Sequence, residues 1–184
     1  MNPANLLTSA RFFLSFMMVY FIFENGGRSA HWALFTFLVA SLTDYWDGRL
    51  ARRRNETTVF GALMDPLADK TLTLCAFLSF WKLDLVPGLW VAVVASRDAI
   101  VTGFRLFSLG RGGDQAAGAS GKRKTFFQMI YISAVLGYLS ARRHSFWDPA
   151  WEEPVLTLVR VGMVGVVLLV LWSGLRALRG KGTP

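Results

Sequence analysis

The sequence predicts an all-α integral membrane protein with six transmembrane helices and a short interfacial segment before the first one. Composition, six apolar segments and the distribution of Lys and Arg support this fold class. The 184 residues are 53% hydrophobic and only 17% charged, with a mean hydropathy of +0.39, whereas a soluble domain carries about 25% charged residues. This composition excludes a disordered chain and indicates that much of the surface faces lipid.

Six apolar segments follow one another along the chain. They cover residues 8–24, 31–48, 67–82, 87–108, 125–141 and 155–173. Several approach the roughly 20 residues that a helix needs to cross a bilayer, and polar or Gly-rich stretches separate them. The first segment has neither a basic leader nor a convincing cleavage site, so we expect it to be retained. We predict a single membrane domain over residues 1–184, in which residues 1–8 are too short to span and lie at the interface.

Lys and Arg are unevenly shared between the two sides of this six-helix arrangement. Eleven lie in the loops and helix ends of one side and four on the other. Positive residues concentrate on the cytoplasmic side of membrane proteins, so we predict that both termini and the two basic loops are cytoplasmic. The net charge of +8 indicates an anionic partner, for which we expect membrane lipid and no nucleic acid.

Four aspartates mark the end of the second segment and the start of the third. Asp44 and Asp47 are spaced i, i+3, and Asp65 and Asp69 are spaced i, i+4, so each pair shares one helix face. A short cytoplasmic loop joins these two helices, which we expect to be antiparallel neighbours that bring the four carboxylates together. Hard divalent cations relieve the repulsion among such anions, and Mg²⁺ favours carboxylates, phosphate oxygens and water. The arrangement predicts two metal ions.

These aspartates also have a structural alternative. In it, Asp65 caps a helix that begins at Pro66, while Asp44 and Asp47 pair with Arg49 and Arg52. Capping explains one carboxylate and leaves three, so we favour the metal site.

The aspartates belong to a longer string. It reads Asp44-Tyr-Trp-Asp47-Gly48-Arg-Leu-Ala51-Arg52, then eight residues, then Gly61-Ala-Leu-Met-Asp65-Pro-Leu-Ala-Asp69. This string resembles the CDP-alcohol phosphotransferase signature, D-x-x-D-G-x-x-A-R followed after a short gap by G-x-x-x-D-x-x-x-D. Every defined position matches, and the six apolar segments fit the six-helix membrane fold of that family.

The resemblance implies that a phosphatidyl group is transferred from CDP-diacylglycerol to an alcohol with release of CMP. It implies two Mg²⁺ or Mn²⁺ ions held by Asp44, Asp47, Asp65 and Asp69, with Asp69 also acting as the general base. It assigns these residues to CDP-diacylglycerol binding: Asn5, Gly48, Ala51, Arg52 and Gly61. Close helix packing is the alternative role of the two glycines. The family also implies a homodimer in the bacterial inner membrane, with the active site facing the cytoplasm.

Basic residues of the fourth and fifth segments favour an anionic acceptor. Arg97 and Arg105 are eight residues apart, slightly over two helical turns, and therefore lie close to one face. The run Gly121-Lys122-Arg123-Lys124-Thr125-Phe-Phe-Gln128 opens the fifth segment from the same side. Together these cations can form a cup for the phosphate of glycerol 3-phosphate. The alternatives are a topology-setting loop for residues 122–124 and a local ion pair with Asp98 for Arg97.

This second region resembles bacterial phosphatidylglycerophosphate synthases, as does the opening Asn5-Leu-Leu-Thr8-Ser-Ala-Arg11. The resemblance implies that Arg97, Arg105 and Lys122 bind the acceptor phosphate. Asp98 is a departure, because those synthases usually have Glu there and the related CDP-dependent cardiolipin synthases have Asp. Phosphatidylglycerol is therefore the alternative acceptor. A membrane transporter is the alternative from another class, and it is disfavoured because the aspartates lie at segment ends.

Overall fold

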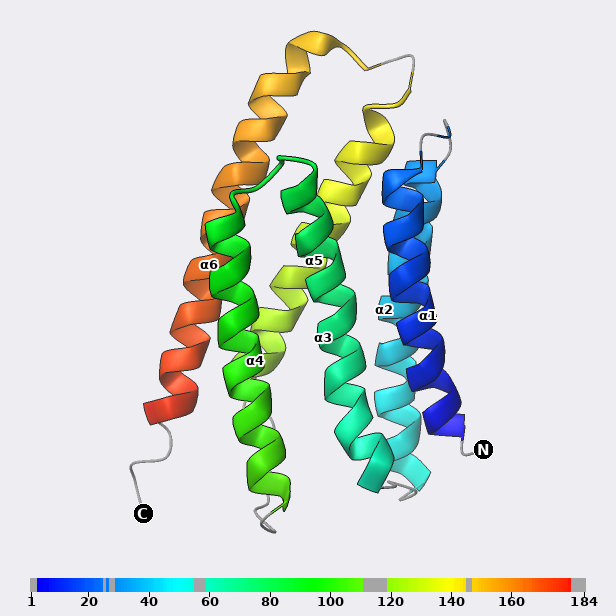
Figure 1. Ribbon diagram of the computed structural model, residues 1–184, viewed down its shortest axis with the longest axis vertical. Helices are drawn as coiled ribbons and strands as arrows, with labels where there is room; N and C mark the ends of the chain where they lie inside the picture. The colour runs from blue at the N-terminus through cyan, green and yellow to red at the C-terminus, as the bar shows by residue number, and fades with distance from the viewer. Residues whose placement is uncertain are drawn as a thin grey trace. The chain divides into compact units, whose positions relative to one another are not determined.

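The computed structural model describes residues 3–24, 26, 29–54, 59–110, 119–144 and 147–179. Within these residues it has six α-helices, one short 3-10 helix and no strand, which confirms the all-α class (Figure 1). The elements are α1 (Pro3–Phe23), α2 (Ser29–Arg54), α3 (Val59–Lys82), α4 (Gly88–Gly110), α5 (Ala119–Ala141), the 3-10 helix Pro149–Trp151 and α6 (Glu152–Arg179).

Several helices extend beyond the apolar segments that predicted them. α2 continues to Arg54, and α3 already begins at Val59. Apolar patterning locates the lipid-facing part of a helix, whereas Arg, Leu and Ala propagate the helix in any solvent. Residues 3–8 form the first turns of α1 and are therefore continuous with the first apolar segment, while their position at the membrane interface stays a prediction. Pro3 suits the first position of this longer helix, where its missing N–H costs no hydrogen bond.

The chain divides into two compact units. The first comprises residues 1–79 and 132–149, and the second comprises residues 80–131 and 150–184. In the first unit, α1 and α2 lie side by side and run in opposite directions (Figure 1). Small residues such as Ala33, which is almost fully buried, allow the close approach of helices that packing in a membrane requires.

An arginine organises the connection between α1 and α2 in the first unit. Nη1 of Arg143 donates to the backbone oxygens of Glu24, at 3.1 Å, and Gly26, at 2.8 Å. The Ser29 hydroxyl, which Arg143 also contacts, donates to the same two oxygens. These contacts provide hydrogen-bond donors for two carbonyls that follow α1, whose last residue is Phe23.

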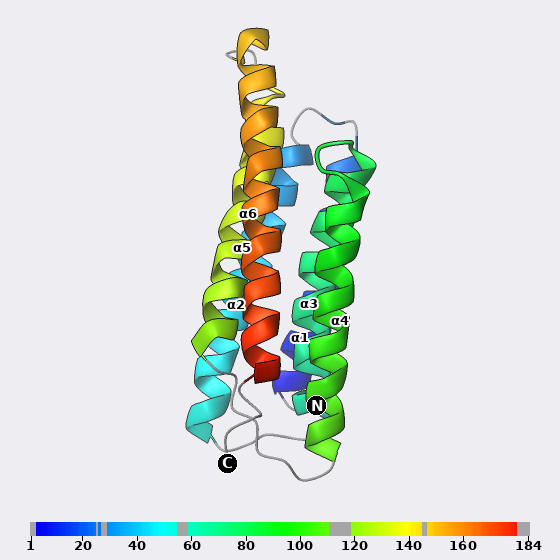
Figure 2. The same cartoon turned by 90° about the vertical axis from the view of Figure 1, so that its left-hand side faces the viewer.

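In the second unit, α4 packs on α6, and Tyr131 of α5 also contacts α6. α4 and α6 are in contact and run in the same direction (Figure 2). The Tyr131 hydroxyl of α5 donates to the Val159 carbonyl of α6 over 2.9 Å. A Cβ at Gly162 would lie 2.9 Å from the Tyr131 ring, so the glycine permits this close approach. The three helices thereby form a framework for buried polar groups.

Large apolar side chains are exposed on each of the six helices. They include Phe13, Phe35, Trp81, Leu89, Phe126 and Leu158. One helix in the described residues, Pro149–Leu175, has both the length and the apolar composition to cross a membrane, and Ser9–Phe23 and Ser29–Thr43 are shorter apolar helices. The helix number therefore agrees with the prediction, whereas spanning length is found for one helix. Charged side chains such as Arg97 and Asp98 interrupt the apolar stretch of α4.

Candidate active site

The four signature aspartates lie on α2 and α3. α2 is helical without a break through Asp44 and Asp47, as α3 is through Asp65 and Asp69. The observed helices therefore place each pair on one face, as the spacing predicted. Within the first unit, α2 and α3 run in opposite directions (Figure 1). The four side chains lie outside the part of the structure that is described, so the carboxylate cluster stays a prediction.

Asp65 does not cap the start of a helix. α3 begins at Val59, and both Asp65 and Pro66 lie inside it. Pro66 has no N–H to donate to the carbonyl of Ala62 one turn earlier, so α3 tolerates a lost hydrogen bond next to this aspartate. The capping alternative is therefore wrong for Asp65. The apolar pattern misplaced the helix start because Asp65 and Pro66 separate the apolar first turns of α3 from the longer apolar run that follows.

The remaining predicted site residues also lie on helices. Side chains outside the described part are those of Asn5, Gly48, Ala51, Arg52, Gly61, Arg105 and Lys122. No group of three or more His, Cys, Asp or Glu residues able to hold a metal occurs among the described side chains, a set that excludes the four aspartates. Arg97 is the predicted site residue whose side chain the structure places.

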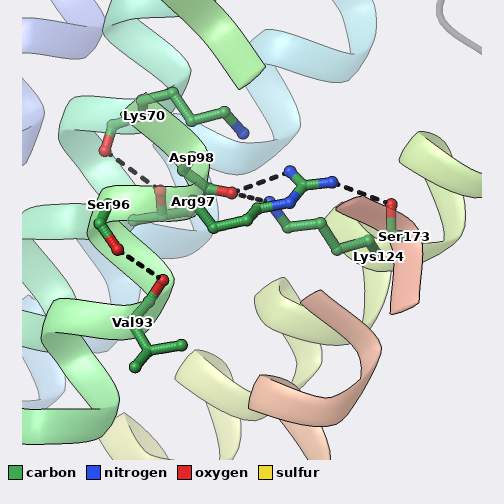
Figure 3. A network of polar contacts seen from close by, with 8 residues as sticks. Lys70, Val93, Ser96, Arg97, Asp98, Lys124 and Ser173 are labelled. Atoms are coloured by element: carbon green, nitrogen blue, oxygen red, sulfur yellow. Dashed lines mark hydrogen bonds and ion pairs between the residues drawn. The ribbon is translucent and has the colours of Figure 1, made fainter. Parts of the chain in front are cut away.

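Arg97 belongs to a buried polar cluster formed by α4, α5 and α6 (Figure 3). Its Nη1 donates to Oδ1 of Asp98 over 3.0 Å, and its Nη2 donates to the Ser173 hydroxyl over 3.2 Å. Nζ of Lys124 forms an ion pair with the same Asp98 oxygen. The side chains of Arg97, Asp98 and Lys124 are only 13%, 9% and 4% exposed. We call these four residues the polar cluster.

A glycine on α6 makes room for the arginine. A Cβ at Gly174 would lie 3.1 Å from Nε and 3.6 Å from Cγ of Arg97. The Arg97 side chain therefore lies against the backbone of α6, next to the Ser173 hydroxyl that it binds. The guanidinium is held from two sides, by Asp98 on its own helix and by Ser173 on α6.

Two cations of the polar cluster bind the same carboxylate. Arg97 and Lys124 share Oδ1 of Asp98. Nε of Arg97 is also buried without a hydrogen-bond partner among the described residues. An anion with several acceptor oxygens, such as a phosphate monoester, could accept a charge-assisted hydrogen bond from this Nε.

The structure bears on both alternatives for these cations. Arg97 does pair with Asp98, as the local ion-pair alternative holds, and in addition it reaches Ser173. Lys124 is only 5% exposed, so the alternative of a topology-setting loop in solvent is wrong for this residue. Sequence reasoning placed Lys124 in a basic run without giving it a partner, and it missed Ser173, a single serine in an apolar segment with no recognisable signal.

Comparison with known proteins agrees with the signature. A family model described as CDP-alcohol phosphatidyltransferase matches residues 1–171. A CDP-diacylglycerol–glycerol-3-phosphate 3-phosphatidyltransferase of Bacillus subtilis is 46% identical over 100 residues, which cover 54% of this chain and 52% of the relative. The chain thus aligns with about half the length of that protein.

Two other relatives align over nearly the whole chain. A probable phosphatidylglycerophosphate synthase of Mycobacterium tuberculosis is 35% identical over 191 residues, covering 98% of this chain and 84% of the relative. A CDP-diacylglycerol–glycerol-3-phosphate 3-phosphatidyltransferase of Shigella flexneri is 34% identical over 190 residues, covering 96% and 93%. The similarity therefore includes both the aspartate helices and the polar cluster.

Proposed function

The chain belongs to the CDP-alcohol phosphatidyltransferase family, and we propose that it transfers the phosphatidyl group of CDP-diacylglycerol to glycerol 3-phosphate. The products are phosphatidylglycerophosphate and CMP. The observation that carries this proposal is the complete two-part aspartate signature, located on two continuous helices. The names of the relatives, which act on the same two substrates, support the choice of acceptor.

The proposed chemistry is a displacement at phosphorus. The C1 hydroxyl oxygen of glycerol 3-phosphate attacks the phosphorus of the phosphatidyl group, and the bond from that phosphorus to the oxygen of CMP breaks. Asp69 accepts the hydroxyl proton, and CMP leaves as a phosphate monoester. General-base assistance of this kind contributes about 10² to 10⁴-fold to a rate.

Four carboxylates provide an oxygen donor set that suits Mg²⁺ or Mn²⁺. We propose that Asp44, Asp47, Asp65 and Asp69 hold two such ions. When bound, the ions would neutralise the donor diphosphate and stabilise charge on the leaving CMP. We assign binding of CDP-diacylglycerol to Asn5 and to the remaining signature residues, which are Gly48, Ala51, Arg52 and Gly61.

The acceptor phosphate is assigned to Arg97, Arg105 and Lys122. The polar cluster supports this assignment because the guanidinium of Arg97 is buried, held in place and left with an unpaired Nε among the described contacts. Lys124 adds a second buried positive charge to the same cluster. An acceptor phosphate held there has its orientation restricted, which favours attack by its free hydroxyl.

We also propose that all six helices span a bacterial inner membrane, with the aspartates on the cytoplasmic side. The exposed apolar side chains on every helix support membrane embedding, because such surfaces are rare on soluble monomers. A homodimer, implied by the family, is part of the proposal. Light scattering of the detergent-solubilised protein tests that assembly.

The decisive experiment incubates purified protein with CDP-diacylglycerol, Mg²⁺ and either glycerol 3-phosphate or phosphatidylglycerol. We expect equal amounts of CMP and phosphatidylglycerophosphate with the first acceptor and none with chelator. Cardiolipin from phosphatidylglycerol, with no product from glycerol 3-phosphate, would establish the alternative acceptor that Asp98 raises. The transporter alternative finds no support in the relatives, whose printed names describe transferases or synthases.

A further inference from the structure

The second unit contains a buried carboxamide that the proposed mechanism does not use. Gln128 of α5 is 2% exposed and ranks among the largest fully buried side chains. Neither its Oε1 nor its Nε2 has a hydrogen-bond partner among the described residues. Burying an amide without hydrogen bonds is destabilising, whereas a Met or Leu of similar size carries no such penalty. A glutamine in this position therefore calls for a ligand that completes its hydrogen bonds.

The register of α5 places Gln128 next to the polar cluster. Lys124 and Gln128 are four residues apart on an unbroken helix, so they occupy successive turns of the same face. Lys124 is the residue through which α5 joins the cluster at Asp98. Gln128 thus lies about 6 Å further along α5 than this cation.

The unpaired atoms of this unit point to one ligand. In the described part of the second unit, buried side-chain nitrogens and oxygens without a partner occur only on Arg97 and Gln128. Arg97 offers a cationic donor, which suits phosphate, and Gln128 offers a neutral amide with both donors and an acceptor. A small molecule that carries a phosphate and a nearby hydroxyl matches this pair of groups.

We propose that Gln128 binds the C2 hydroxyl of glycerol 3-phosphate and makes the acceptor site selective for it. This inference rests on the proposed function. The acceptor has three polar groups: its phosphate is assigned to the cations, and its C1 hydroxyl must be free to attack phosphorus. The C2 hydroxyl is the group that remains, and a hydroxyl can donate to Oε1 while it accepts from Nε2.

The test compares two acceptors that differ only at C2. Glycerol 3-phosphate carries the hydroxyl, whereas 3-hydroxypropyl phosphate keeps the phosphate and the primary hydroxyl and lacks it. Wild-type protein is expected to prefer glycerol 3-phosphate by about tenfold in kcat/KM, the value of one buried hydrogen bond. In Gln128→Met, which conserves volume, that preference should fall to nearly one, while KM for CDP-diacylglycerol stays within twofold.

Two measurements separate ligand binding from a structural role. Ile130→Met places the same new side chain on the same helix at a position that is 49% exposed, and it should keep the wild-type preference. The Tm of Gln128→Met without substrate should equal or exceed that of wild type, because an unpaired amide has been removed. A lower Tm together with equal losses for both acceptors would show a structural role and overturn the proposal.

The remaining outcomes are also decisive. Wild-type protein that uses both acceptors equally, or a Gln128→Met variant that still prefers glycerol 3-phosphate, would overturn the role of Gln128 and leave the proposed function intact. A rise in KM for CDP-diacylglycerol alone would assign Gln128 to the donor instead. Wild-type protein that makes no product from glycerol 3-phosphate would overturn the proposed function and this inference with it.

Discussion

Replacing Asp98 by Asn tests whether the polar cluster is a buried ion network. The substitution keeps the size of the side chain and removes the one carboxylate that Arg97 and Lys124 share. Breaking a buried ion pair from one side costs about 3–5 kcal/mol because a charge is left without compensation. The Asn oxygen still accepts hydrogen bonds, so we expect the lower end, about 3 kcal/mol. For a chain of this size, this loss corresponds to a decrease in Tm of about 6–12 °C.

The assay is thermal unfolding of wild-type and variant protein in one detergent at one scan rate. Asp84→Asn is the matched control, because it makes the same chemical change at an exposed loop position. Asp84 has a φ of 56°, a conformation that Asn adopts readily, so its Tm should change by no more than about 2 °C. Asp98→Glu keeps the charge and should lose less stability than Asp98→Asn.

An anion should partly replace the missing carboxylate. Inorganic phosphate is expected to raise the Tm of Asp98→Asn more than that of wild type, since the variant has lost the carboxylate that Arg97 and Lys124 share. If the Tm of Asp98→Asn lies within 2 °C of wild type, like that expected for the Asp84 control, water already screens the charges of the polar cluster. The reasoning from burial would then be refuted.

Three further predictions concern the catalytic groups. Asp65→Asn should abolish Mg²⁺-dependent turnover while the protein stays folded, because the proposed metal site would lose a ligand; full activity of a folded variant, or activity in chelator, would contradict that site. Asp69→Asn should lower kcat by about 10² to 10⁴-fold. If the variant instead loses affinity for CDP-diacylglycerol and keeps its kcat, Asp69 is a binding residue. Arg105→Gln should raise KM for glycerol 3-phosphate about tenfold or more and spare KM for CDP-diacylglycerol, so equal increases in both would refute its role at the acceptor.

Apolar periodicity was sufficient to predict the number and order of the helices. Each of the six apolar segments corresponds to one helix, because a stretch long enough to approach a bilayer crossing has few other structures available. The helix ends were harder to predict. The turns of α2 that end at Arg54 are rich in arginine, so apolar patterning does not report them. The first turns of α3 are apolar but are cut off from the rest of the apolar run by Asp65 and Pro66.

In the candidate site, the sequence predicts the local spacings but not the contacts between residues that are far apart in the chain. The spacings of the aspartates are local, so a helix is enough to predict which of them share a face. The contact of Arg97 with Ser173 joins residues that are 76 positions apart, and no periodicity reports which two helices will pack. Gly174, whose missing side chain admits Arg97, is likewise ordinary in sequence and becomes informative only beside α4.

The contacts of Arg97 also bear on whether Asp98, in place of the usual Glu, identifies the acceptor alcohol. Neighbouring residues on a helix do not face each other, yet Arg97 binds Asp98 through Nη1 while its Nη2 binds Ser173 of α6. In the proposed acceptor site, Asp98 would act through the placement of Arg97 and Lys124. Ser173 and Gly174 also contribute to the placement of Arg97. Asp in place of Glu is therefore not enough to identify phosphatidylglycerol as the acceptor. The side chain of Asp is shorter, and Arg97 and Lys124 can still bind it from slightly different positions. The acceptor has to be read from the product that the wild-type protein forms.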